Sequence, residues 1–280
     1  MKYPVTYFLL LPITCCLLLV ACYSPRYVYG PAATNVPAFS KKGDSKLAAF
    51  YSNSTFGGRD VKKFYGYGFD AQAAYALNDH WLVLLNQSNR YEKNSGDLAT
   101  YSLDSNSIRY KRTMTEIGGG YFRAVKDSSK LYVQLTGGIG FGRFSLDDNG
   151  KNAANQYYNR HHQTGVTKFF IQPALQLRYS KNFNTSFASR FVVLWYHSIK
   201  TNYTAAEQKK YLLDDLTTSP RTFWEPAVIN SFSFKKFSAI QFEIQFGFAA
   251  LISHRFIDYR SVNISAGAVV DVFKLGKKRK

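Results

Sequence analysis

The chain has 280 residues, a formal net charge of +18, and 21 tyrosines and 23 phenylalanines against three tryptophans and two methionines. On a soluble protein such an excess of positive charge would suggest nucleic acid or anionic surfaces as partners. The basic residues are spread along the chain except for the run Lys277 to Lys280, and no nucleic-acid motif accompanies them, so nucleic acid is excluded as an expected partner.

The first residues form a secretion signal. Met1 and Lys2 precede an almost unbroken apolar run from Tyr7 to Ala21, which is the pattern of a signal peptide. The run is shorter than the about 20 apolar residues that a membrane-spanning helix needs. We therefore expect residues 1–21 to be removed from the mature protein.

The apolar run closes with the four residues Leu19-Val20-Ala21-Cys22. They resemble the lipobox of bacterial lipoproteins. The resemblance implies cleavage before Cys22, acylation of that cysteine, and stable attachment to membrane lipid through its hydrocarbon chains. Cys15 and Cys16 lie in the removed segment, so Cys22 has no disulfide partner in the mature chain. The alternative is an ordinary secretory signal with incidental cysteines.

Residues 22–44 are predicted to be a lipidated tether. Pro25, Pro31 and Pro37 interrupt this stretch, which has little periodicity and reads as an extended link between the anchor and a folded domain. We expect the domain to cover residues 45–274 and a basic tail to follow over 275–280.

The domain consists of segments in which apolar and polar residues alternate. In residues 240–250 the apolar side chains fall on every second position, opposite Gln241, Glu243 and Gln245, and residues 69–77, 131–141 and 262–272 repeat this design. A period of two predicts β-strands with one apolar face. The ten predicted strands cover residues 45–56, 66–77, 81–92, 108–125, 130–145, 164–180, 185–199, 222–234, 237–251 and 259–273.

The predicted connections alternate in length. Tight turns at residues 78–80, 126–129, 181–184 and 235–236 would lie at one end of an up-and-down sheet, and the long connections would lie at the other. Short periplasmic turns and long outer loops are typical of outer-membrane barrels, and a sheet that spans a bilayer must close. The prediction is an all-β, closed, antiparallel up-and-down barrel of about ten strands, with apolar side chains toward lipid and polar ones toward a narrow lumen.

This strand-and-loop pattern resembles small outer-membrane barrel proteins of the OmpA and OmpX sort over nearly the whole domain. Their last strand commonly finishes with a terminal phenylalanine, whereas here Phe273 is followed by Lys274-Leu275-Gly276 and the basic tail. The resemblance implies the outer membrane of a Gram-negative-type bacterium. With ten strands, both chain ends are expected on the periplasmic side, and the residues after Cys22 lack the acidic run that exports some lipoproteins to the surface.

Five charged residues form a candidate polar network in the lumen: Asp70, Glu116, Arg178, Arg190 and Glu243. Buried charges usually exist in pairs. We interpret these residues as a polar plug that closes a small barrel. An enzyme would instead use some of the carboxylates in catalysis.

The histidines give no convincing site. His161 and His162 are neighbours in the sequence and would point to opposite faces of a strand, which makes a poor metal chelate. His197 and Ser198 resemble the residues that barrel enzymes use to deacylate lipopolysaccharide, but adjacent strand positions cannot share a face and no acid partner is identifiable. We predict no catalytic residue, metal or cofactor.

The leading prediction is a lipid-anchored outer-membrane barrel with a structural, adhesive or small-pore role and no enzymatic activity, whose loops 146–163 and 200–221 form contact surfaces. Its expected partners are membrane lipid, through acylated Cys22 and the barrel wall, and anionic lipid or lipopolysaccharide. One alternative is a lipid-anchored soluble barrel that binds an apolar ligand, in the manner of bacterial lipocalins, with the apolar stripes inside. A second alternative is a barrel enzyme that acts on lipid.

Overall fold

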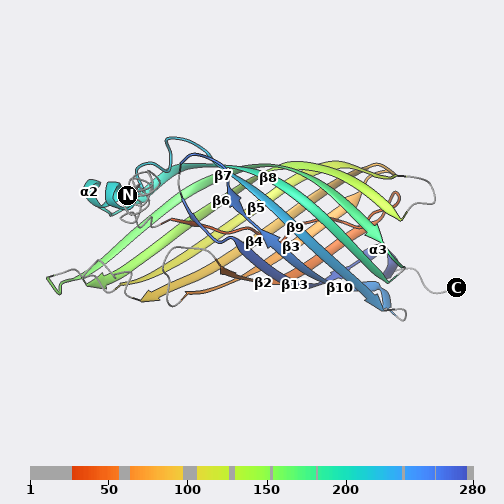
Figure 1. Cartoon of the computed structure of the whole chain (residues 1–280), viewed down its shortest axis with the longest axis horizontal. Coiled ribbons are helices and arrows are strands. Elements are labelled where there is room, and N and C mark those ends of the chain that lie inside the picture. Colours follow the sequence, from red (N-terminus) through yellow and green to blue (C-terminus); the bar gives the residue numbers. More distant parts are fainter. Residues whose placement is uncertain are drawn as a thin grey trace, which may run out of the picture.

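A computed structural model describes residues 27–275, except 57–63, 97–105, 126–129, 152–153, 181, 235–236 and 256. The predicted signal peptide, Cys22 and residues 276–280 of the predicted basic tail lie outside the described residues. Ten long strands form the wall of the molecule (Figure 1): β2 Ser45–Phe56, β3 Phe64–Ala76, β4 Trp81–Gly96, β5 Asn106–Ala124, β6 Leu131–Lys151, β7 Tyr157–Arg178, β8 Phe183–Thr201, β9 Arg221–Phe234, β10 Phe237–Phe248 and β13 Val262–Val270.

The sheet is closed. Each strand pairs antiparallel with the next, and β13 pairs antiparallel with both β10 and β2, with Ala268 opposite Phe242 on one side and Ala49 on the other. This confirms the predicted ten-stranded up-and-down barrel. We call the end that carries residues 77–80 and 179–182 the short-turn end, and the end that carries residues 202–220 and 249–261 the long-loop end.

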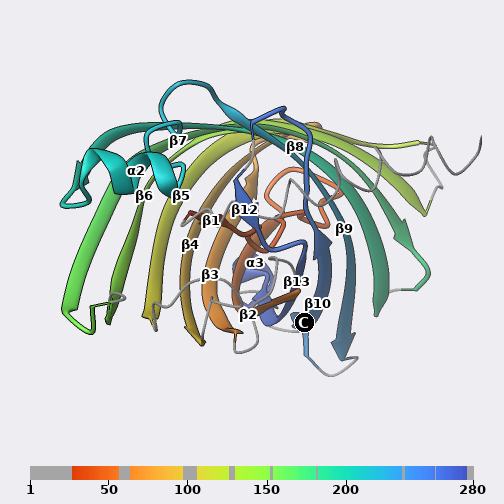
Figure 2. The same ribbon diagram turned by 60° about the vertical axis from the view of Figure 1, so that its left-hand side comes forward.

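Smaller elements lie at the ends and inside the barrel. β11 (Ala250–Leu251) extends the pairing with β9, and β1 (Val28–Tyr29) pairs in parallel with β12 (Asp258–Tyr259) inside the ring of strands (Figure 2). Two short helices, α2 (Ala205–Lys210) and α3 (Val272–Leu275), were not expected. None of the helices in the described part of the chain is long and apolar enough to cross a membrane.

The alternating side chains face as predicted. Phe242, Phe246 and Phe248 are 41–50% exposed on the outer face, whereas Glu243 and Gln245 between them are buried inside. The residues of the other predicted stripes, such as Leu47, Phe69 and Leu135, are also exposed outward. This facing is opposite to the one that a ligand-carrying soluble barrel would need.

The apolar outer face covers only the part of the barrel near the short-turn end. On β6 the outward positions are apolar up to Phe141, and the next outward residues are Arg143, Ser145 and Asp147. From Val133 to Phe141 the strand rises by about 26 Å, or about 20 Å along the axis of a barrel with strands tilted by about 45°. Strands β5 to β8, with 19 to 22 residues each, therefore extend well beyond the apolar band.

Two predicted boundaries were wrong. Residues 146–163 were expected to form a long loop, but β6 runs to Lys151 and β7 begins at Tyr157, because the strands continue as paired backbone after the outward side chains become polar. The last strand was expected to reach residue 273, but it ends at Val270, and Phe273 lies in α3 with its ring 5.7 Å from that of Tyr75.

Glycines on β5 and β6 allow these two strands to pack closely around Phe170. A Cβ atom on Gly138 would come closer than 3.0 Å to the Ile117 carbonyl oxygen and to the Phe170 ring. We expect Gly138→Ala to lower the free energy of unfolding by about 1–3 kcal/mol, because the added methyl overpacks this site. Unfolding in urea, followed by gel mobility without heating, measures the loss.

The matched control is Gly247→Ala, where the nearest atom to the new Cβ is the Asn263 carbonyl oxygen at 3.6 Å. We expect this substitution to leave the unfolding curve unchanged. Equal effects of the two substitutions would contradict the packing argument.

Candidate functional site

The lumen is filled by the N-terminal part of the described chain. Residues 27–39, which we call the lumen segment, run inside the barrel, and their largest side chains are 1–3% exposed: Tyr27, Val28, Tyr29, Val36 and Phe39. Residues 22–44 were predicted to be a tether outside the domain. This was wrong for the lumen segment. Proline and glycine occur in a chain that packs against the barrel wall as readily as in one that lies in solvent, so their presence did not distinguish the two.

The lumen segment runs from the long-loop half of the barrel to the short-turn end. The Tyr27 hydroxyl donates a hydrogen bond to the Phe144 carbonyl oxygen (3.0 Å), and the Tyr27 ring contacts those of His162 and Tyr196. At the other end, Phe39 packs against Phe122. Both chain ends were expected at the short-turn end. The C-terminal strand does end there, but the first described residue lies in the opposite half.

Side-chain amides of the wall satisfy the backbone of the lumen segment. Gln72 donates to the Ala33 carbonyl oxygen and Gln172 to that of Asn35, both at 2.9 Å. Gln245 accepts a hydrogen bond from the Thr34 backbone N–H (2.7 Å) and donates to its carbonyl oxygen (3.0 Å). Buried backbone groups need such partners. The sequence feature that could have indicated these contacts is the presence of glutamines on the inward face of several strands.

The five residues of the predicted lumen network lie in separate groups. Glu116 binds Arg190 (2.7 Å) and also Lys168, and these three side chains are at most 3% exposed. Asp70 pairs instead with Arg90 (2.7 Å). The Glu116 group and the Asp70–Arg90 pair both lie beside the middle of the lumen segment, and we call them together the buried ion-pair cluster.

Glu243 and Arg178 lie away from this cluster. Glu243 pairs with Lys46 (3.3 Å). Arg178 donates to the carbonyl oxygens of Ala38 and Phe39, and its guanidinium lies 3.9 Å from the centre of the Tyr132 ring. Arg178 therefore binds the backbone of the lumen segment near the short-turn end and does not pair with a carboxylate of the predicted network.

A second ion-pair group, not expected from the sequence, joins the lumen segment to the loop before β13. Glu92 pairs with Arg112 (3.1 Å) and with Arg260, and Arg112 donates to the Val28 carbonyl oxygen (2.7 Å). Burial raises the pKa of Asp258 to about 6, although its neighbour Arg260 opposes the shift. These contacts surround the short β1–β12 pair and fix it inside the barrel.

The centre of the lumen is closely packed. The Tyr29 hydroxyl donates to the Glu225 carboxylate, and the centre of the Tyr29 ring lies 4.4 Å from that of Phe223, with the two rings tilted by 33°. The cavity beside Tyr29, which Lys168 also lines, has a volume of about 20 Å³, enough for about one water molecule. Among the described residues, the space beside Tyr29 is thus no larger than a water molecule.

The half of the lumen toward the long-loop end, which we call the upper lumen, is more apolar than predicted. Inward-facing residues of β5 to β9 form a buried cluster around Tyr27, Val28 and Tyr29, including Ile108, Phe144, Leu146, Val166, Leu194 and Phe223. Tyr203, Leu213 and Ile257 from the long loops join the same cluster. A polar filling was expected because a small barrel was assumed to be closed by side chains of its own wall, whereas the lumen segment supplies apolar partners.

His161 and His162 lie as the alternation predicts. His162 is buried and faces the lumen, while His161 faces outward and pairs with Asp147 (2.7 Å). The expectation that His197 and Ser198 cannot share a face was wrong, because Ser198 has a positive φ of 54° that interrupts the alternation. Both side chains are exposed, and the His197 ring contacts the hydroxyls of Ser198 (3.0 Å) and Thr167 (3.2 Å). Within the described ranges, no group of three His, Cys, Asp or Glu side chains could hold a metal ion.

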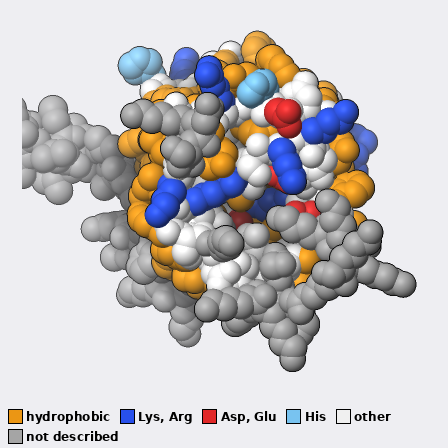
Figure 3. All heavy atoms as spheres, turned by 90° about the vertical axis from the view of Figure 1, so that its right-hand side faces the viewer, with side chains coloured by type: hydrophobic (Ala, Val, Ile, Leu, Met, Phe, Trp, Pro, Cys, Tyr) orange, Lys and Arg blue, Asp and Glu red, His pale blue; other side chains and the backbone are white. Residues whose placement is uncertain are grey.

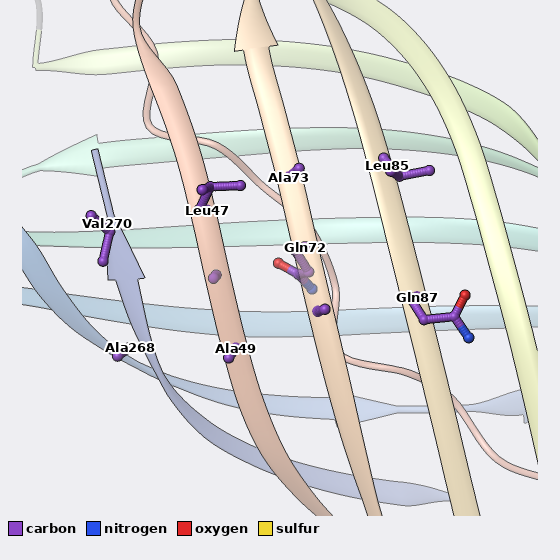
Figure 4. Close-up of a pocket in the computed structure, with 10 residues that line it drawn as sticks. Leu47, Ala49, Gln72, Ala73, Leu85, Gln87, Ala268 and Val270 are labelled. Atoms are coloured by element: carbon purple, nitrogen blue, oxygen red, sulfur yellow. The ribbon is translucent and has the colours of Figure 1, made fainter. Parts of the chain in front are cut away.

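The outer wall has a shallow groove of about 420 Å³ over β13, β2, β3 and β4 (Figure 4). Small alanines line much of it, among them Ala49, Ala73 and Ala268, between the larger Leu47 and Leu85. The groove lies within the apolar band. It is therefore part of the apolar outer surface and not a second site in the lumen.

The short-turn end is mainly basic. Figure 3 shows more lysine and arginine than aspartate and glutamate side chains on this face, and Lys41, Lys42 and Lys130 are among its exposed residues. Such a surface attracts anionic groups.

The fold defines the class of the protein, a closed up-and-down β-barrel with an apolar outer band and a filled lumen. No family model matches the sequence, and no curated protein matches it. Among solved structures, the translocator domain of the autotransporter NalP from Neisseria meningitidis aligns with a TM-score of 0.46 and 10% identity over 82% of this chain and 88% of that one.

Two further solved structures are similar. An outer membrane channel from Pseudomonas putida F1 aligns with a TM-score of 0.39 and 10% identity over 85% of this chain and 99% of that one. The attachment invasion locus protein of Yersinia pestis, in complex with the heparin analogue sucrose octasulfate, aligns with a TM-score of 0.32 and 15% identity over 57% of this chain and 98% of that one. At these scores the similarities assign no function to this chain.

Proposed function

We propose that the protein is an outer-membrane barrel of a Gram-negative-type bacterium, held additionally by an acylated Cys22, with a structural or adhesive role and no enzymatic activity. The observation that supports this proposal is the outer face: apolar side chains cover a band of about 20 Å, and polar ones begin above it. A bilayer requires a closed sheet with such a band.

The part of the barrel above the apolar band supports a role in contact with other molecules. Strands β5 to β8 extend into it, and the loop of residues 202–220 with α2 lies at this end. Its exposed side chains include Tyr157, Lys209 and Lys210. A surface with exposed lysines and aromatic residues suits an anionic partner, such as lipopolysaccharide.

A small-pore role is the second candidate, and it would require the lumen segment to move. Gln72, Gln172 and Gln245 hold its backbone, and the cavity beside Tyr29 is no larger than a water molecule. The closed lumen favours the structural or adhesive role.

The substitution Cys22→Ser tests the anchor and the spanning barrel together. We expect the variant to lose metabolic labelling with palmitate completely but to remain in the membrane after washing with alkaline carbonate, because the barrel wall itself contacts lipid. Gel mobility with and without heating should show a folded barrel in both proteins. Release of the unacylated variant into the wash would contradict the spanning barrel and favour a soluble, tethered one.

A further inference from the structure

The course of the lumen segment determines on which side of the membrane the anchor can lie. We propose that acylated Cys22 is held at the long-loop end, so that its hydrocarbon chains enter the outer leaflet at the cell surface and the chain runs inward from there through its own barrel to β2. This inference rests on the proposed function, namely a spanning barrel with an acylated Cys22. It reverses the expectation that the anchor is periplasmic.

The first argument is the length of chain. Tyr27 is bonded to the backbone of Phe144, which lies 13 positions along β6 from its start at Leu131 near the short-turn end. Thirteen strand residues extend about 43 Å, or about 30 Å along the axis of a barrel with strands tilted by about 45°. Cys22 precedes Tyr27 by five positions, which span at most about 18 Å. Cys22 therefore cannot reach the short-turn end.

The second argument is the level at which Tyr27 lies. Its neighbours Phe144 and Tyr196 follow the last bulky apolar outward residues on their strands, Phe141 and Trp195, which are 58% and 51% exposed. The next outward residues are Arg143 and His197. Tyr27 thus lies at the upper edge of the apolar band, where the head groups of the outer leaflet would be. Cys22, at most about 18 Å from this level, therefore lies on the outer-leaflet side of the barrel.

The third argument is the shape of the rim. Strands β10, β13, β2 and β3 have 9 to 13 residues, against 19 to 22 in β5 to β8. The pairing of β1 with β12 places Tyr29 beside the loop that leads into β13, whereas Tyr27 lies against the longer strands β6, β7 and β8 through Phe144, His162 and Tyr196. The described wall is lowest over β10, β13, β2 and β3, so the shortest path from the lumen to the lipid crosses these strands.

Single-cysteine labelling tests this arrangement. The thiol of Cys22 is blocked by acylation and the mature chain has no other cysteine, so an introduced cysteine is the one free thiol. We would compare Ser24→Cys with Asn155→Cys at the long-loop end and Lys42→Cys at the short-turn end, using a membrane-impermeant maleimide on intact and on permeabilised cells. We expect Ser24→Cys and Asn155→Cys to label equally in both preparations, and the labelling of Lys42→Cys to rise several-fold after permeabilisation.

The outcomes separate the inference from the proposed function. If Asn155→Cys labels in intact cells but Ser24→Cys labels only after permeabilisation, like Lys42→Cys, the inference is overturned and the spanning barrel stands. If Asn155→Cys also requires permeabilisation, or if the protein takes up no palmitate, the proposed function fails and the inference fails with it. A short epitope inserted between Tyr23 and Ser24, detected by antibody on intact cells, gives a second readout that does not depend on thiol reactivity.

Discussion

Deleting residues 27–39 should convert the closed barrel into an open channel. In planar lipid bilayers we expect the full-length mature protein to give no current steps and the deletion variant to give discrete, ohmic ones. The physical reason is that the lumen segment occupies the space between the walls: Val36 packs against Ala174 and Ile229, and Tyr29 against Phe223. Single-channel recording of the purified proteins measures the effect.

The control is a variant that lacks residues 154–156, which lie between β6 and β7 and are exposed. It should remain closed. If the deletion of residues 27–39 also gave no current while its gel mobility still showed a folded barrel, the wall side chains alone would close the lumen, and the plugging role of the lumen segment would be wrong.

The substitution Glu116→Gln should lower the free energy of unfolding by about 3–5 kcal/mol, because it leaves two buried cations without their counter-charge. Arg190 lies 2.7 Å and Lys168 2.9 Å from the Glu116 carboxylate, and all three side chains are at most 3% exposed. Unfolding in urea from lipid vesicles can be followed by fluorescence, since the three tryptophans Trp81, Trp195 and Trp224 are exposed on the outer face.

The matched control is Asp147→Asn, which breaks the pair with His161 at the same distance of 2.7 Å but with both side chains about half exposed. Such exposed pairs contribute at most about 1 kcal/mol, so the unfolding curve should shift little. Similar shifts of the unfolding curve for Glu116→Gln and Asp147→Asn would mean that burial does not increase the contribution of the lumen ion pairs to the free energy of unfolding.

The sequence predicted the wall of the barrel because strand side chains obey a local rule. Phe242, Glu243 and Ile244 face alternately outward, inward and outward, and this follows from neighbouring positions alone. The extension of β6 beyond residue 145, where the predicted strand ended, was missed because Asp147, Asp148 and Asn149 have the composition of a loop, although their backbone remains paired with β7. Above the apolar band the outward residues are polar and the inward Phe144 and Leu146 are apolar, and this alternation ends after Leu146.

The lumen segment could not be predicted in the same way, because its contacts join residues far apart in the chain. Gln245 meets Thr34 across 211 positions, and Gln172 meets Asn35 across 137. Alternation showed that Glu116 and Arg190 face the lumen but not that they pair, since they meet across the barrel from strands 74 positions apart. Which inward charges become partners depends on the closed geometry.

The way in which the wall holds the lumen segment has an evolutionary consequence. Gln72, Gln172 and Gln245 bind carbonyl and amide groups that every residue of the lumen segment possesses, whatever its side chain. Mutations at Ala33, Thr34 or Asn35 would keep these bonds, whereas a mutation of any of the three glutamines would remove one. In related chains we therefore expect the strand glutamines to be retained while the threaded residues diverge, with limits on volume at apolar positions such as Val36.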